Sequence, residues 1–185
     1  MLHQEKNLCL AQLEKTGINR SMSKLIINTL SFQLGWWLCV LYGDAAAPWV
    51  VLGVVFVHHR LVGNMIIQWP FMLALTSVGV LFDSALNSLG VLVFPESALF
   101  PPMWLVAIWV LFSTTLLYAL RPLVRYRIGF SLVCGIAGPA SYLAGSQFAD
   151  VKLGMPLTSS LLWLSLAWMI MGLIISEALR RVRLI

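Results

Sequence analysis

Long apolar stretches alternate with short polar ones along most of this chain. Six apolar segments stand out, at about 25–43, 46–66, 70–94, 102–120, 128–147 and 157–176. A helix crosses a membrane with about 20 apolar residues, because the hydrocarbon core is about 30 Å thick and each residue adds about 1.5 Å. The pattern therefore predicts an all-α, polytopic transmembrane helical bundle with six spans.

The segments also suggest the domain organisation. We expect a polar N-terminal lead at 1–24, a six-helix transmembrane domain at 25–176 and a basic cytoplasmic tail at 177–185. The stretch "MSKLIINTLSFQLGWW" resembles a natural beginning for a membrane protein, so we hypothesise that translation starts at Met22. Intact-mass analysis of natively expressed protein tests this start site.

The second segment allows two interpretations. Its apolar run "APWVVLGVVFV" is interrupted by "HHR". In one, the helix is short and His58, His59 and Arg60 reach the cytoplasmic interface. In the other, the helix continues through Gly63 to about Ile66, which places both histidines near the middle of the membrane.

Composition agrees with a membrane protein. Hydrophobic residues make up 60% of the chain and charged residues only 10%, with a mean hydropathy of +0.90. The three cysteines, Cys9, Cys39 and Cys134, lack metal-ligand spacing and an even count, so we expect no disulfide framework. The adjacent His58 and His59 lack a third ligand at metal spacing, so we expect no metal site, and we expect no cofactor. A net charge of +5 in so apolar a chain marks topology, and we expect no nucleic-acid partner.

The basic residues predict the orientation. Eleven of the twelve lysines and arginines flank the same ends of the predicted helices, whereas the opposite loops hold Asp44, Glu96, Asp150 and Lys152. Cytoplasmic loops are enriched in lysine and arginine. Both termini are therefore expected in the cytoplasm, as an even number of spans requires.

The third segment carries a polar face. Thr76, Gly79, Asp83, Asn87 and Gly90 recur at intervals of three and four, which places them on one side of a helix. A charged aspartate at the centre of a spanning helix costs about 2.5–3.5 kcal/mol on insertion scales, so Asp83 should be protonated, hydrogen-bonded or facing water. Asn87, one turn away, is a candidate partner.

Other polar residues of the first two segments could complete a cluster around Asp83. Gln33 lies at a similar predicted depth, and Asn28 lies nearer the cytoplasm. His58 or His59 joins them if the second helix is long. We therefore expect Asp83 to be held by a polar cluster from the first three helices. The alternative is a structural role, because buried polar residues form interhelical hydrogen bonds worth about 0.6 kcal/mol on average.

The fifth segment, "GIAGPASYLAGSQF", predicts close helix packing. Ala137, Ser141 and Gly145 form a stripe of small residues, and Pro139 removes one backbone donor. The residues to which we assign packing roles are Gly138, Pro139, Ser141, Tyr142 and Gly145. Tyr142 could also reach the polar cluster. Trp109 and Trp168 lie far from the predicted ends of their segments and are expected in the core.

The chain resembles a family of small bacterial inner-membrane proteins known as domain of unknown function 2878. The stretches that carry the resemblance are "NTLSFQLGWW", a histidine in the second segment, "GVLFDSALNSLGVLVFP", "PMWLVAIWVLFSTTL" and "GIAGPASYLAG", within about 25–176. Signature positions are occupied by Asn28, Gln33, His58 or His59, Asp83, Trp104, Trp109, Gly138, Pro139, Tyr142 and Gly145. Leu117 and Tyr118 depart from an expected Asn-His-like pair. The resemblance implies a bacterial inner-membrane location and no activity.

Three functions follow as hypotheses. The first is a non-catalytic accessory protein that binds membrane lipids, a membrane enzyme or a second copy of itself. The second is a small homo-oligomeric transporter with Asp83 as a proton or cation site. The third is an intramembrane lipid-modifying enzyme with His58 or His59 as base and Asp83 as its orienting partner. The chain has no P-loop and no HExxH or GxSxG motif.

Overall fold

The computed structural model describes residues 2–62, 65–95 and 98–181, and almost all of them are helical. In chain order the elements are α1 (Leu2–Tyr42), η1 (Gly43–Ala45), α2 (Ala47–Val57), the π-helix η2 (His58–Val62), α3 (Met65–Ser88), β1 (Leu92–Val93), α4 (Met103–Leu117), α5 (Arg121–Val124), α6 (Arg127–Phe148), β2 (Lys152–Leu153) and α7 (Leu157–Arg181). The prediction of an all-α fold is confirmed.

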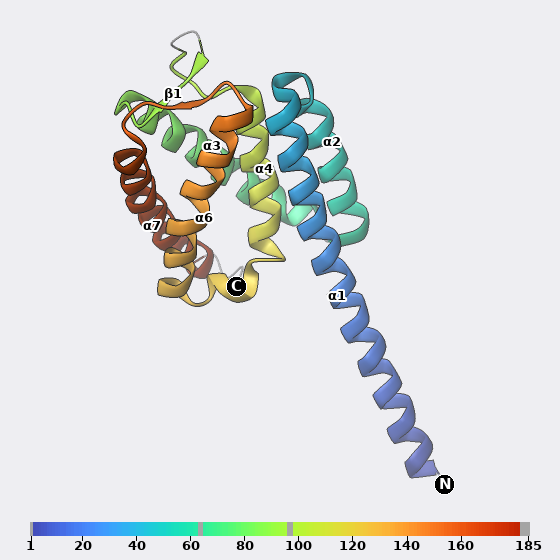
Figure 1. The fold of residues 1–185 in the computed structure, drawn as a ribbon. Helices are drawn as coiled ribbons and strands as arrows, with labels where there is room; N and C mark the ends of the chain where they lie inside the picture. The colour runs from blue at the N-terminus through green and yellow to red at the C-terminus, as the bar shows by residue number, and fades with distance from the viewer. Residues whose placement is uncertain (1, 63–64, 96–97, 182–185) are drawn as a thin grey trace.

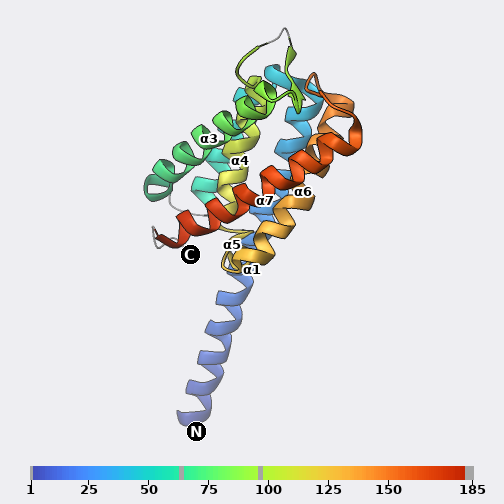
Figure 2. The same cartoon turned by 90° about the vertical axis from the view of Figure 1, so that its left-hand side faces the viewer.

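Four helices in the described part of the chain are long and apolar enough to cross a membrane: Ser21–Ala45, Gln68–Ser88, Arg127–Phe148 and Leu157–Arg181. Two further apolar helices, Ala47–Val62 and Met103–Leu117, are shorter. The helices alternate in direction along the chain, so consecutive helices begin at opposite ends of the bundle (Figures 1 and 2).

The helices form two packed groups. On one side α1, α2 and α4 pack against one another, and on the other α6 packs along α7 (Figure 1). Helix α3 packs against α4. Contacts between α1 and α6 are few. A cavity lies where this contact is sparse.

The end of the bundle that carries β1 and β2 is here called the hairpin end. There the third helix ends earlier than the predicted segment 70–94. Helix α3 ends at Ser88, and residues of 89–94 form a turn and β1, which pairs with β2 in antiparallel register. Gly90 has a φ of +70°, and the Val91 amide donates to the Leu86 carbonyl at 2.9 Å. These are features of the Schellman helix end, in which glycine tolerates the left-handed conformation.

The second helix agrees fully with neither of the two interpretations of the second segment. Helical structure continues past the histidines through η2 as far as Val62, but a new helix, α3, has begun by Met65. Residues 63 and 64 lie outside the described part of the chain. A π-helix widens the turn by one residue and is frequent at functional or adjusted sites.

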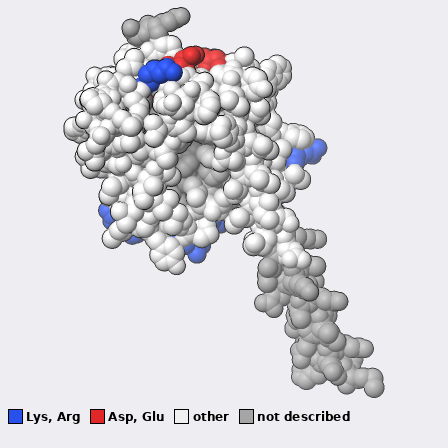
Figure 3. Space-filling view, viewed as in Figure 1, with Lys and Arg blue, Asp and Glu red and all other residues white. Residues whose placement is uncertain are grey.

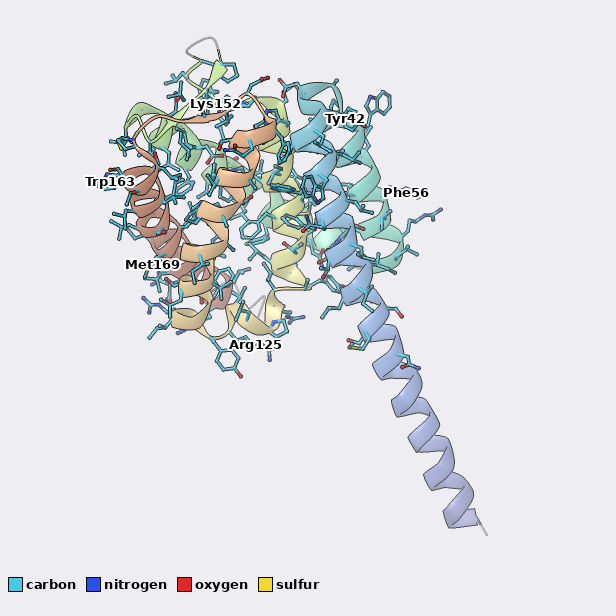
Figure 4. All side chains as sticks on the ribbon, viewed as in Figure 1. Tyr42, Phe56, Arg125, Lys152, Trp163 and Met169 are labelled. Carbon is cyan, nitrogen blue, oxygen red and sulfur yellow. The ribbon has the colours of Figure 1, made fainter. Side chains whose placement is uncertain are left out.

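On the face drawn in Figure 3, charged side chains lie mostly at the two ends of the bundle, with one further basic group on its right flank. The end opposite the hairpin, where α5 joins α4 to α6, is here called the arginine end, and Arg125 lies there (Figure 4). Lys152 lies at the hairpin end, where it donates to the carbonyls of Ser146 and Ala149 at the close of α6. Asp44 lies there too, and its carboxylate accepts the Trp104 amide at the start of α4.

Candidate functional site

Asp83 lies at the centre of the fold and is fully buried. Trp109 of α4 donates its indole Nε1–H to Asp83 Oδ2 at 2.7 Å, and Tyr142 of α6 donates its hydroxyl to Oδ1. The prediction that Asp83 is held by the first three helices is therefore wrong. Its partners come from α4 and α6, and both carboxylate oxygens are satisfied without Asn87, Gln33 or a histidine.

Two stacked indole rings lie beside this carboxylate. The rings of Trp109 and Trp168 are inclined by only 3°, with centroids 5.3 Å apart. A Cβ on Gly79 of α3 would lie 2.0 Å from the Trp109 ring, and one on Gly138 of α6 would lie 2.3 Å from the Trp168 ring. The indole pair is therefore held between two glycines, one on each side, and four helices meet at this point.

Other aromatic rings surround the indole pair edge-on. Phe82 and Phe112 each present an edge to both tryptophans, with centroid separations between 5.5 and 6.0 Å. Edge-to-face contacts between aromatic rings are favourable by about 0.5–1.5 kcal/mol beyond the area that they bury. The Asp83 carboxylate is thus embedded in an aromatic core and directed by two specific donors.

Asn28 is buried but lies away from Asp83. Its amide group donates to Thr114 Oγ1 at 3.4 Å, and its oxygen accepts the Ala119 amide at 3.3 Å. Since α4 ends at Leu117, Asn28 satisfies a backbone amide just beyond the end of the helix. Its predicted place in the Asp83 cluster is wrong, and its role is to fix α1 to the end of α4.

Asn87 also lies outside the Asp83 cluster. Its side chain accepts the Phe94 amide at 3.1 Å and donates to the Ala98 carbonyl at 3.1 Å. Asn87 therefore holds the connection that follows α3 at the hairpin end. One helical turn separates it from Asp83 in sequence, but its bonds are made to this connection.

The histidines do not meet Asp83 either. His58 is buried, with Nε2 2.7 Å from Gln68 Oε1 and its ring edge-on to Tyr118 at 5.4 Å. Tyr118 follows Trp109 by nine residues, about 14 Å along a helix. His59 is exposed. The predicted pairing of a histidine with Asp83 is therefore wrong.

A cavity of about 590 Å³, here called the groove, separates α1 from α6. The stacked indoles of Trp109 and Trp168 form its floor. The face of the molecule drawn in Figure 3 is hollowed near its middle. Its lining comes mainly from α1, α4 and α6 and includes Phe32, Gln33, Trp36, Ile108, Trp109, Phe112, Ala137, Ala140, Ser141, Tyr142, Ala144, Gly145 and Trp168. Gln33, predicted in the Asp83 cluster, is instead an exposed side chain of the groove wall.

The groove is open along one side and crossed by one hydrogen bond. Gln33 of α1 and Ala137 and Ala140 of α6 are exposed lining residues, so the opening lies between these two helices. Trp36 Nε1–H donates to Ser141 Oγ at 3.0 Å, which joins α1 to α6. The opening therefore faces the apolar flank of the bundle.

The small residues of α6 have two different roles. The Trp168 ring packs closely against Gly138, and Pro139 is buried within the helix, as expected of packing positions. Gly145 lines the groove, and a Cβ there would meet nothing within 4 Å. The prediction that Gly145 packs closely against another helix is therefore wrong. Ser141 and Ala137 also face the groove, because side chains four apart share one side of a helix.

The described residues form an all-α protein with four helices able to cross a membrane and a buried carboxylate beneath a lateral groove. The chain belongs to the family described as "Protein of unknown function (DUF2878)", whose family model matches residues 25–173. No curated protein and no solved structure matches the chain.

Nothing in the sequence predicts the groove, and the predicted roles of its residues Gln33 and Gly145 are wrong. No pattern in the sequence points to Trp36 as a groove residue, and the positions of Trp109 and Trp168 predict the core and not the wall of a cavity. A signal was present, since Gly79 and Gly138 lack the side chains that would exclude two large rings. Which tryptophan lies against which glycine depends on helix packing that one sequence does not specify.

Proposed function

We propose that this protein is a non-catalytic, integral membrane protein that holds the acyl chain of a membrane lipid in the groove. The observation that carries the proposal is the groove itself. Its volume of about 590 Å³ lies within the range of about 300–1,000 Å³ that small-molecule sites occupy. Its walls are mainly aromatic and aliphatic, and its open side is on the flank that lipid would cover.

Six spans with both termini in the cytoplasm are part of this proposal. Helices Ala47–Val62 and Met103–Leu117 are about 24 and 22 Å long, shorter than a typical hydrocarbon core of about 30 Å. Local bilayer thinning accommodates short helices at modest cost. Their alternating direction and the arginines at one end support six crossings with the arginine end inside, in a bacterial inner membrane.

Gly145 offers a direct test of the groove. A leucine at this position adds a side chain to open space inside the groove. Gly53 is a matched control, because it is also a helical glycine with nothing within 4 Å of a Cβ, and it does not line the groove. The full chain with Gly145→Leu or Gly53→Leu is compared with wild type by native mass spectrometry after purification from membranes.

We expect wild type and Gly53→Leu to retain bound lipid and Gly145→Leu to lose most of it while its melting temperature stays close to that of wild type. Equal lipid retention by Gly145→Leu and Gly53→Leu, with both proteins folded, overturns the proposal. Absence of lipid from wild type, even after addition of phospholipid, overturns it as well.

The observed bonds give less support to the two other functions. A transporter would need a path to Asp83, but both of its oxygens are bonded and the residue is fully buried. The proposed enzyme needs a histidine against Asp83, and His58 bonds to Gln68 instead. Association with a membrane enzyme or with a second copy stays a prediction beside lipid binding.

A further inference from the structure

The groove is electrostatically different at its two ends. Ala119 and Leu120 line it at the arginine end, and Arg121 follows them directly in the chain. Arg125 follows one turn later, in the same connection between α4 and α6. Both arginines are exposed. A molecule that fills the groove to this end therefore lies next to the connection that carries both arginines.

These two arginines are not neutralised within the described residues. The salt bridges there join Arg180 and Arg181 to Glu177, and Glu177 also feels the charge of Arg127. Arg121 and Arg125 are in none of these pairs. Their guanidinium groups are thus available to an anion from outside the protein, and arginine matches phosphate oxygens with paired hydrogen bonds.

Among the residues that the structure describes, the hairpin end has no comparable free cation. Lys152 is bonded to two carbonyls at the end of α6, and its neighbours there include the acidic Asp44 and Asp150. Val40 and Val151 line this end of the groove. The groove thus offers an apolar channel with cations at one end only, which fits an amphiphile with one anionic head.

We propose that the lipid bound in the groove is an anionic phospholipid, with its phosphate at Arg121 and Arg125 and one acyl chain between α1 and α6. This inference rests on the proposed lipid binding and adds the class of lipid and its direction. Arginine near an anionic head strengthens binding through both charge and hydrogen bonds. A zwitterionic lipid of equal chain length should bind more weakly, because its own cation opposes the arginines.

The test compares dioleoyl-phosphatidylglycerol with dioleoyl-phosphatidylcholine in titrations of the full chain, followed by native mass spectrometry. The double variant Arg121→Gln with Arg125→Gln removes the proposed head site. Arg60→Gln with Arg181→Gln is the matched control, since it removes two exposed arginines that do not line or adjoin the groove. Melting temperatures show whether each variant is folded.

Wild type should prefer the phosphatidylglycerol, and the Arg121/Arg125 variant should lose about fivefold of that preference for each arginine removed. The Arg60/Arg181 control should keep it. Equal binding of both lipids by wild type, or an unchanged preference in the Arg121/Arg125 variant, overturns the head site and leaves the groove intact. Loss of both lipids in Gly145→Leu distinguishes this outcome, because it reports on the groove alone.

Discussion

Trp109 and Trp168 come from different helices, yet their indole planes lie 3° from parallel with glycine against each outer face. Trp109 also donates its N–H to Asp83, so the stacked pair fixes the position of the buried carboxylate and forms the floor of the groove. A change in the spacing of the indoles should therefore affect stability and lipid binding together.

Substitution of either flanking glycine by alanine should destabilise the protein. Gly79→Ala and Gly138→Ala each place a methyl group within 2.4 Å of indole atoms, and such overpacking costs about 1–3 kcal/mol. Gly145→Ala is the control, since its new methyl group meets nothing within 4 Å. Unfolding in mixed micelles gives the free energy of unfolding of each variant. Equal stability of all three variants would contradict the close packing of the indole pair between Gly79 and Gly138.

Replacement of Asp83 should depend on what the new side chain offers Trp109 and Tyr142. In Asp83→Asn the amide oxygen still accepts from Trp109, and the amide N–H donates to the Tyr142 oxygen, so we expect a loss below about 1 kcal/mol. In Asp83→Leu both donors lack a partner, and the loss should reach about 2–4 kcal/mol, from about 1–2 for each stranded group. Unfolding free energies give the order. Asparagine as harmful as leucine would show that the negative charge itself is needed.

The all-α fold could be predicted from the sequence because helices that cross a membrane need long apolar runs. The length and periodicity of such runs are visible in a single chain. Hydrogen bonding of Asp83 was one of the three states that the sequence allowed, because an aspartate in such a run must be protonated, hydrogen-bonded or facing water. Its partners did not follow, because Trp109 and Tyr142 lie 26 and 59 residues away and no local rule pairs them. Asn28 and Gln33 are both polar residues of one apolar helix, so the sequence predicts the same role for both. Only the packing shows that Asn28 is buried against α4 and that Gln33 is exposed in the groove wall.

This difference between Asn28 and Gln33 can be measured. Asn28→Ala leaves the Ala119 amide and Thr114 without their partner, and we expect a loss of about 1–3 kcal/mol in unfolding free energy. Gln33→Ala removes an exposed side chain of the groove wall and should stay within about 0.5 kcal/mol of wild type. The reverse order would restore Gln33 to the buried polar cluster that the sequence suggested.

The six-span topology predicts which sites are reachable from each side of the membrane. Single cysteines are placed at Ala45, His59, Ala98 and Arg125 in a chain whose native cysteines are replaced by alanine. We expect a membrane-impermeant maleimide to label the Ala45 and Ala98 sites from outside and the His59 and Arg125 sites only from the cytoplasmic side, because α2 and α4 cross between them. Labelling of Ala45 and His59 from the same side would show that α2 does not cross.

The hydrogen bond from Trp36 to Ser141 should control how quickly lipid leaves the groove. It joins two helices that otherwise make few contacts, so its loss lets α1 and α6 separate more often. Ser141→Ala should raise the dissociation rate of bound phosphatidylglycerol several-fold, with a stability loss of at most about 1.5 kcal/mol.

Exchange of bound lipid for a deuterated copy, followed by native mass spectrometry, gives the rate. Ser141→Thr keeps the hydroxyl and is the control. Because threonine can still accept from Trp36, exchange at the wild-type rate in Ser141→Thr together with faster exchange in Ser141→Ala would assign the effect to this bond. Equal rates in all three proteins would mean that lipid leaves by a route that does not require α1 and α6 to part.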